Sequence, residues 1–300
     1  MGEDKKKKRE VTGKTESRKV GMLSSALITI GPMGIWTLLF FVFPFLYVIV
    51  VSFCTRDEYG NIIYRFTLKA YETLLKPAYY TIIYRTVLMA LVVTFLVILI
   101  AYPYAYIASR AGKFIRNLMI IGIVIPFWTN ALLRIYAIMN VTSKNGLINT
   151  FLINLGIIDK PIQILYTQFA VYFGLIYSLL PLMVMPLYSS LQKIEPAILE
   201  AGRDLGASSF QLFRKVIFPL SIPGIMGGVV LVFVPAMFNF YVADALGGGK
   251  MIIIGNVISN QFSVSKNWPF GAALSVVIMI FSTLIIILNN KVSAPEKEAE

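Results

Sequence analysis

The chain has 300 residues, of which 57% are hydrophobic and only 14% are charged, and its mean hydropathy is +0.75. Soluble domains carry roughly a quarter charged residues, so this composition excludes a soluble globular protein. The absence of histidine and the single cysteine, Cys54, exclude imidazole catalysis, an internal disulfide and a Cys- or His-based metal cluster. In a membrane protein, a net charge of +12 is typical of basic cytoplasmic loops and does not indicate nucleic-acid binding.

The first segment, residues 1–20, is polar and dense in Lys and Arg. The apolar stretch that follows it is longer than the roughly 7–15 residues of a cleavable signal peptide. We therefore expect a cytoplasmic arm that fixes the membrane topology; binding of the basic run to anionic lipid is the alternative.

Six stretches of the chain are long and apolar enough to cross a bilayer as helices, which takes about 20 residues each. They lie at about 27–53, 86–109, 118–140, 167–191, 219–243 and 270–290. The third contains one charge, Arg134. The sequence thus predicts an all-α integral membrane protein with a six-helix domain over residues 21–290 and a tail over 291–300.

The distribution of basic residues predicts the orientation. Six spans place both termini on one side, and that side holds most of the Lys and Arg residues, so both termini are predicted to be cytoplasmic. Two long segments then lie outside, and their apolar pieces Thr67–Leu75 and Leu147–Leu155 are predicted to form short helices.

The loop 193–219 is predicted to be cytoplasmic and to contain two short helices. Pro196 suits the first position of the first helix, and Gly206 can close that helix in the left-handed conformation. Ser208 and Gln211 form a capping-box pattern at the start of the second helix, which is predicted to run into the fifth span.

An apolar ridge on this loop needs a surface to bury against. Ile198, Ala201 and Leu205 fall on one face of the first helix, three and four residues apart. The ridge fits either an amphipathic hairpin on the membrane surface or a knob that docks into a soluble partner.

The same loop resembles the EAA loop of ABC-importer permeases. Glu200-Ala201-Gly202, then Gly206, then Val216-Ile217-Phe218-Pro219 follow the spacing of the family pattern Glu-Ala-Ala, Gly, Ile-x-Leu-Pro. The resemblance implies a type I ABC importer permease fold. It also implies that Glu200, Ala201, Gly202, Asp204 and Gly206 contact a separate ATP-binding subunit.

Four further segments resemble the spermidine/putrescine permeases of the PotB type. They are Pro126–Tyr136, Leu180–Ser190, Glu200–Ser208 and Asn267–Ala273, and the likeness runs from about Phe45 to the sixth span. The resemblance implies a bacterial inner-membrane importer of polyamines. Its expected partners are a second homologous permease, a pair of ATPase subunits and an extracytoplasmic polyamine-binding protein; no cofactor or metal is implied.

Other mechanisms fit the sequence less well. The Gly247–Lys250 run is followed by Met251 in place of Ser or Thr, so the chain lacks this phosphate-binding loop and ATP must be hydrolysed by another subunit. An ion-coupled secondary transporter would place carboxylates inside the membrane, and no Glu lies within any predicted span. The sequence has no His and no clustered acidic residues for a membrane enzyme to use. An ABC permease for another small solute remains an alternative.

A polycationic solute calls for carboxylate and aromatic groups along its path. Asp244 lies one turn after Tyr241 and Phe240 at the outer end of the fifth span, and Trp128 and Tyr136 belong to the third. These five residues are the candidate pathway residues, although aromatics at span ends are also common interface anchors. Arg134 is predicted to pair with Asp244 or to cap carbonyls freed by Pro126 or Pro235.

Overall fold

The computed structural model describes residues 31–293, with side chains described as far as Asn289. The predicted arm, 1–20, and the end of the predicted tail, 294–300, lie outside these residues. Within the described part, five helices are long and apolar enough to cross a membrane. They are Gly31–Ser52, Pro77–Arg110, Gln168–Gln192, Ser209–Phe238 and Trp268–Asn289. The all-α membrane fold is confirmed.

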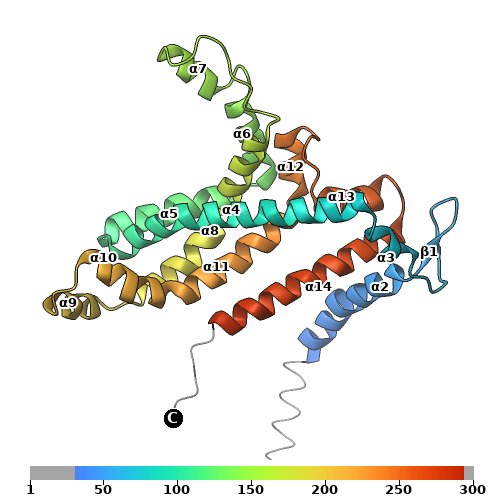
Figure 1. Ribbon diagram of the computed structural model, residues 1–300, viewed down its shortest axis with the longest axis horizontal. Helices are drawn as coiled ribbons and strands as arrows, with labels where there is room; N and C mark the ends of the chain where they lie inside the picture. The colour runs from blue at the N-terminus through green and yellow to red at the C-terminus, as the bar shows by residue number, and fades with distance from the viewer. Residues whose placement is uncertain (1–30, 294–300) are drawn as a thin grey trace, which may run out of the picture.

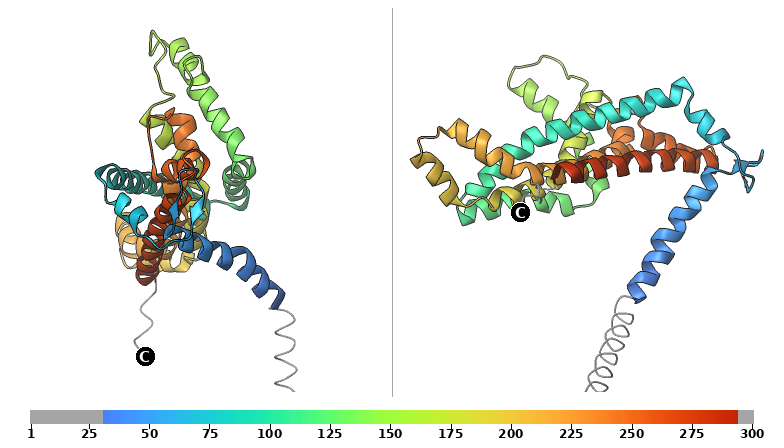
Figure 2. Two further views of the ribbon diagram at one scale, coloured as in Figure 1. Left: turned by 90° about the vertical axis from the view of Figure 1, so that its right-hand side faces the viewer. Right: turned by 60° about the horizontal axis from the view of Figure 1, so that its bottom comes forward.

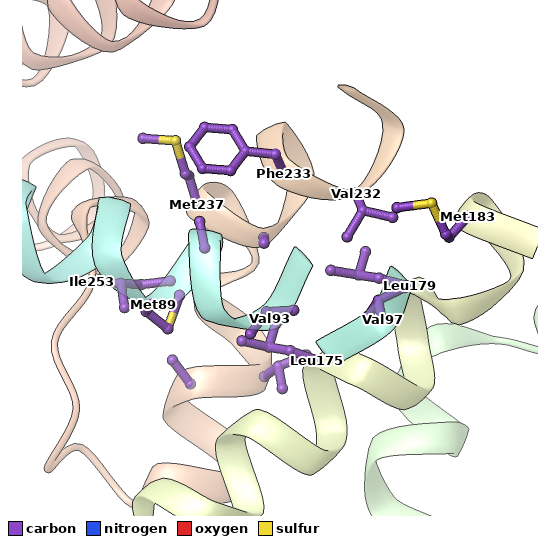
Figure 3. Close-up of a cluster of buried hydrophobic side chains, with 14 of the residues drawn as sticks. Met89, Val93, Val97, Leu175, Leu179, Met183, Val232, Phe233, Met237 and Ile253 are labelled. Atoms are coloured by element: carbon purple, nitrogen blue, oxygen red, sulfur yellow. The ribbon is translucent and has the colours of Figure 1, made fainter. Parts of the chain in front are cut away.

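The core is formed by three of these helices: α4 (Pro77–Arg110), α8 (Gln168–Gln192) and α11 (Phe218–Phe238). Figure 3 shows their side chains meeting, with Val93 of α4, Leu175 of α8 and Phe233 of α11 in one cluster. Val93 and Leu175 are fully buried. Close packing of this apolar cluster joins the helices, and hydrogen bonds add to it: the hydroxyls of Tyr102 on α4 and Ser221 on α11 lie 3.0 Å apart, and Ser190 of α8 donates to the Leu220 carbonyl of α11 at 3.2 Å.

Two glycines of α11 bring its backbone against α8. A Cβ at Gly224 would lie 2.8 Å from the carbonyl oxygen of Pro186 and 3.1 Å from Leu187 Cα. A Cβ at Gly228 would collide with the Met183 side chain. Gly224 and Gly228 thus have the GxxxG spacing that lets membrane helices approach closely, and here it allows α8 and α11 to pack directly against each other.

The predicted third span, 118–140, is divided into α5 (Lys113–Trp128) and α6 (Ala131–Thr142). The helical segments on either side of the break are bent by 100°. Pro126 has no N–H to continue the helix, and both the backbone N–H and the hydroxyl of Thr129 bond to the Pro126 carbonyl. Asn130 then caps α6 by accepting the N–H of Leu132 at 2.8 Å.

The fifth span also differs from the prediction, because α11 ends at Phe238 instead of residue 243. Asn239, with φ −77° and ψ 59°, turns the chain into a separate helix, α12 (Phe240–Gly247). Another helix, α13 (Ile254–Ser263), approaches the break closely: a Cβ at Gly255 would lie 2.9 Å from the Phe238 carbonyl oxygen. The predicted pathway residues of this region therefore lie on α12, outside the long helix.

The remaining elements are the second and sixth spans and the segments that connect the long helices. The second span begins at Pro77, nine residues before the predicted start, because Pro77 opens a helix that continues unbroken through it. In the long segments between the spans, β1 (Thr55–Arg56) and β2 (Ile62–Ile63) form a small hairpin, and the two predicted short helices are present as α3 (Lys69–Leu74) and α7 (Leu147–Asn154). The sixth span is α14 (Trp268–Ser293).

The first helix stands away from the core. It contains a π-helical turn, η1 (Leu38–Val42), followed by α2 (Phe43–Ser52). Only 6% of the residues in its apolar stretch are buried. Figure 2 shows α2 touching the start of α14 and then diverging from the other helices. Its apolar surface thus faces outward along most of its length.

We expect Gly224→Ala to lower the stability of the α8–α11 contact by about 1–3 kcal/mol, because the added methyl meets backbone atoms that cannot move aside. The measurement is the thermal unfolding midpoint of the detergent-purified protein. Gly227→Ala is the matched control, since a Cβ there meets only Pro186 Cβ at 3.7 Å. Equal midpoints for the two variants would contradict this account of the contact.

Candidate functional site: a helical hairpin and a polar groove

The first candidate site is the hairpin of α9 (Pro196–Asp204) and α10 (Ser209–Leu212). Pro196 begins α9, and Gly206 follows it with φ +78°, as the sequence predicts. Ser208 accepts the N–H of Gln211 while the Gln211 side chain accepts the N–H of Ser208, which confirms the capping box. Figure 1 places the hairpin at one end of the long helices, opposite β1.

Gly202 packs the two arms of the hairpin together. A Cβ at Gly202 would lie 2.5 Å from Leu212 Cδ2, and Leu212 is only 5% exposed. The helix beyond continues through a π-helical turn, η2 (Phe213–Ile217), into α11, as the sequence predicts. The hairpin is therefore joined rigidly to a core helix.

The hairpin exposes large apolar side chains beside its charged residues. No residue of α9 is buried, and Leu205 at the turn is 89% exposed. Phe210 on α10 is 70% exposed. Below the turn lies a concavity of about 350 Å³ lined by Gly202, Gly206 and Lys215, among others. An exposed apolar tip beside such a concavity has the form of a docking surface.

The second candidate site is a groove of about 490 Å³ between α12 and α13. This volume falls within the range of small-molecule sites, about 300–1,000 Å³. Polar side chains of α13 line it: Asn256, Ser259, Asn260, Gln261 and Ser263. Asp244 contributes the groove's carboxylate and Tyr79 of α4 an aromatic ring. Such a lining suits a cationic ligand with several N–H donors.

Asp244 is exposed to the groove and bonded to α13. Its Oδ1 accepts a hydrogen bond from Asn256 Nδ2 at 2.6 Å. The α13 helix is in turn fixed to the core, because the Ile254 N–H donates to Thr86 Oγ1 of α4 at 3.0 Å in a buried position. The carboxylate therefore has a defined place.

Two of the predicted aromatic residues meet beside α12. The phenol of Tyr136 on α6 is a neighbour of the Tyr241 phenol and raises the pKa of Tyr241 above its ordinary value. The packing of α12 on α6 and α8 allows the contact. A protonated phenol keeps its neutral ring face available for a cation.

The other predicted pathway residues occupy different surroundings. Phe240 begins α12, and its carbonyl oxygen lies 3.4 Å from Asn256 Nδ2. Trp128 is 86% exposed at the end of α5 and does not line the groove. The polar face of α13 was missed by the sequence reasoning, although Asn256, Asn260 and Ser263 recur four and three residues apart, which indicates one helical face.

Arg134 does not pair with Asp244 in the described part of the chain. Its guanidinium lies over the Phe127 ring, 5.5 Å from the centroid, and its Nε is buried without a hydrogen-bond partner among the described residues. The bend between α5 and α6 produces this contact, because it folds α6 back near the end of α5. A cation–π interaction thus replaces the predicted ion pair.

A larger groove of about 550 Å³ lies between α2 and α14 and has a different chemistry. Its lining is almost entirely apolar, including Phe45, Ile49 and Met279, and it contains no charged side chain. It has aromatic rings but no carboxylate to pair with a cation, so the polar groove with Asp244 is the candidate ligand site.

Comparison with known proteins identifies the family. The model of the family described as "binding-protein-dependent transport system inner membrane component" matches residues 95–294. The chain belongs to this family. This inner-membrane component is a multi-pass membrane protein with no catalytic role of its own, as its similarity to transport permease proteins also shows.

Curated relatives of this inner-membrane component are similar over most of both chains. The spermidine/putrescine transport system permease protein PotB of Haemophilus influenzae is 43% identical over 259 residues, covering 86% of this chain and 91% of the relative. PotB of Escherichia coli is 45% identical over 253 residues, covering 84% and 92%. The permease protein PotC of Escherichia coli is 32% identical over 114 residues, covering 38% and 43%.

The fold is similar to that of solved ABC importers. A chain of a bacterial ABC transporter involved in the import of the acidic polysaccharide alginate matches with a TM-score of 0.70 and 16% identity, covering 93% of this chain and 97% of that one. The likeness confirms the type I importer permease fold.

We expect Arg134→Gln and Phe127→Leu to show coupling in a double-mutant cycle, whereas Arg134→Gln and Asp244→Asn add independently. A partly desolvated cation–π contact contributes about 0.5–2 kcal/mol, which sets the size of the coupling. The measurement is thermal unfolding of the four proteins in each cycle. Coupling with Asp244 and none with Phe127 would restore the ion pair predicted from the sequence.

Proposed function

We propose that this chain is the permease subunit of an ATP-driven importer of polyamines of the spermidine and putrescine class. Relatives named as spermidine/putrescine permeases, at 43% and 45% identity, support the class of solute. The observation that carries the proposal is Asp244, the carboxylate of a groove that is also lined by carboxamides, hydroxyls, a tyrosine ring and the aliphatic side chains of Ile82, Ile252, Val257 and Val264. Polyamines are flexible polycations, and such a groove matches their ammonium groups.

The chain works with a second, homologous permease, and the solute passes between the two. The partial likeness to a second permease protein, PotC, supports this pairing. A binding protein outside the membrane delivers the solute. A solved alginate transporter in complex with a ligand-bound periplasmic protein, which has the same fold with a TM-score of 0.71, illustrates such an assembly.

The α9–α10 hairpin docks into a separate ATP-binding subunit, of which the complex contains a pair. Its exposed apolar tip at Leu205 and Phe210 needs a partner surface, and its continuity with α11 provides a route for movement into the membrane. Glu200, Ala201, Gly202, Asp204 and Gly206 form this contact. The hairpin end of the molecule, and with it both termini, is then cytoplasmic.

Transport follows alternating access. ATP binding draws the two ATPase subunits together and moves the hairpins, which tilt α8 and α11. The groove between α12 and α13 then receives the solute at the outer end and releases it inward when the ATPases separate.

We expect Glu200→Lys and Gly206→Val to uncouple ATP hydrolysis from uptake in the assembled transporter. The first reverses a charge on the exposed docking face, and the second forces a branched residue into φ +78°, at a cost of about 1–2 kcal/mol. The measurement is ATPase activity and spermidine uptake in proteoliposomes. Glu58→Lys on the opposite hairpin is the control, and normal uptake by the first two variants would refute the docking assignment.

We expect Asp244→Asn to lower spermidine uptake about tenfold or more, because a charge-assisted contact to the ammonium group contributes about 1.5–3 kcal/mol. The measurement is uptake and spermidine-stimulated ATPase activity of the complete reconstituted complex. Asp159→Asn, an exposed carboxylate outside the groove, is the matched control. Stimulation of the wild type by another solute and not by spermidine would retain the permease and reject the polyamine.

A further inference from the structure

Asn256, in the first turn of α13, has its carboxamide orientation fixed by the backbone. Its Oδ1 accepts the N–H of Ile253 at 3.0 Å, which is the capping contact at the start of the helix. The carboxamide oxygen of Asn256 is therefore bonded to the backbone. The amino end must then face α12, where Nδ2 donates to Asp244 Oδ1 at 2.6 Å.

This arrangement fixes which oxygen of Asp244 is engaged. An amide N–H is a donor, and its hydrogen bond to a carboxylate oxygen is charge-assisted. The bond engages Oδ1 and leaves Oδ2, among the described residues, for a ligand in the groove. The other titratable side chain that lines the groove is the phenol of Tyr79.

The position of Asn256 is itself held by the core. Ile253 and Ile254 are 1% and 0% exposed, and the Ile254 N–H is bonded to the buried Thr86 hydroxyl. The amino group of Asn256 also reaches the Phe240 carbonyl at the start of α12. Asn256 thus connects α12 to a fixed point on α4.

We propose that Asn256 is a positioning residue for solute transfer, which holds the Asp244 carboxylate directed into the groove. The inference rests on the proposed function, because it assigns a partner to the carboxylate that receives the ammonium group. Without Asn256 the exposed Asp244 side chain is free to rotate on α12. The solute then escapes capture when the binding protein opens, while the ATPase cycle continues.

The test is Asn256→Leu, which keeps the size and branching of the side chain and removes its polar groups. The complete transporter is reconstituted in proteoliposomes with its binding protein and spermidine, and the readout is spermidine accumulated per ATP hydrolysed. We expect this ratio to fall about tenfold, the effect of losing one charge-assisted hydrogen bond, with stimulated ATPase activity retained. Asn117→Leu, an exposed carboxamide on α5, is the matched control.

A swap variant, Asp244→Asn with Asn256→Asp, separates positioning from folding. The new carboxylate on α13 still accepts the Ile253 N–H, and the new carboxamide on α12 donates to it, so the pair and the charge are preserved. We expect the swap to transport several-fold more spermidine per ATP than Asp244→Asn alone.

Each outcome bears on one assignment. An unchanged ratio in Asn256→Leu overturns the positioning role, even when Asp244→Asn lowers uptake and the proposed function stands. A loss of ATPase activity and uptake together shows a structural role and also overturns it, as does a swap no better than Asp244→Asn. If Asp244→Asn itself leaves uptake unchanged, Asp244 is not a pathway residue, and that part of the proposed function is overturned before the role of Asn256 is tested.

Discussion

The contact of α8 with α11 is the interaction on which both candidate sites depend. Gly224 and Gly228 bring the two backbones together in a membrane, where lipid and side chains are equally apolar and close packing supplies the attraction. The α9–α10 hairpin connects these two helices at one end. At the other end α12 packs on α8, where Gly174 leaves room for Val242 and Leu246. The hairpin and the groove are therefore connected by packed helices.

The predicted third and fifth spans are each interrupted by a break in the regular helix. Backbone groups that leave a helix at membrane depth need another partner. At the first break Thr129 and Asn130 provide it. At the second, α12 and α13 lie against each other and Asn256 bonds to the Phe240 carbonyl. These segments carry Tyr136, Tyr241 and Asp244; of the three, Asp244 lines the groove, and the groove's other polar side chains come from α13 and from Tyr79 of α4.

The groove and the hairpin differ in how visible they are in the sequence. The hairpin is local: Pro196, Gly206, Ser208 and Gln211 determine its helices through caps and turns, and the structure confirms each of them. The groove is assembled from α12, α13 and the start of α4, which is far from the other two in the chain. Asp244 and Tyr241 could be singled out by residue type, but their partners Asn256 and Tyr136 could not be assigned. The Arg134 pairing was wrong for the same reason.

The sequence by itself determined the membrane class, the approximate positions of the long helices, the capped hairpin and the family. These follow from composition, apolar length and local hydrogen bonding, which require no knowledge of distant neighbours. The tertiary structure alone decided that the third predicted span bends by 100°, that the fifth ends at Phe238, and that the polar face of α13 meets Asp244. A hydropathy pattern measures how long and apolar a segment is. Whether a helix continues past a proline depends on which neighbours satisfy the freed backbone groups, and only packing supplies those neighbours.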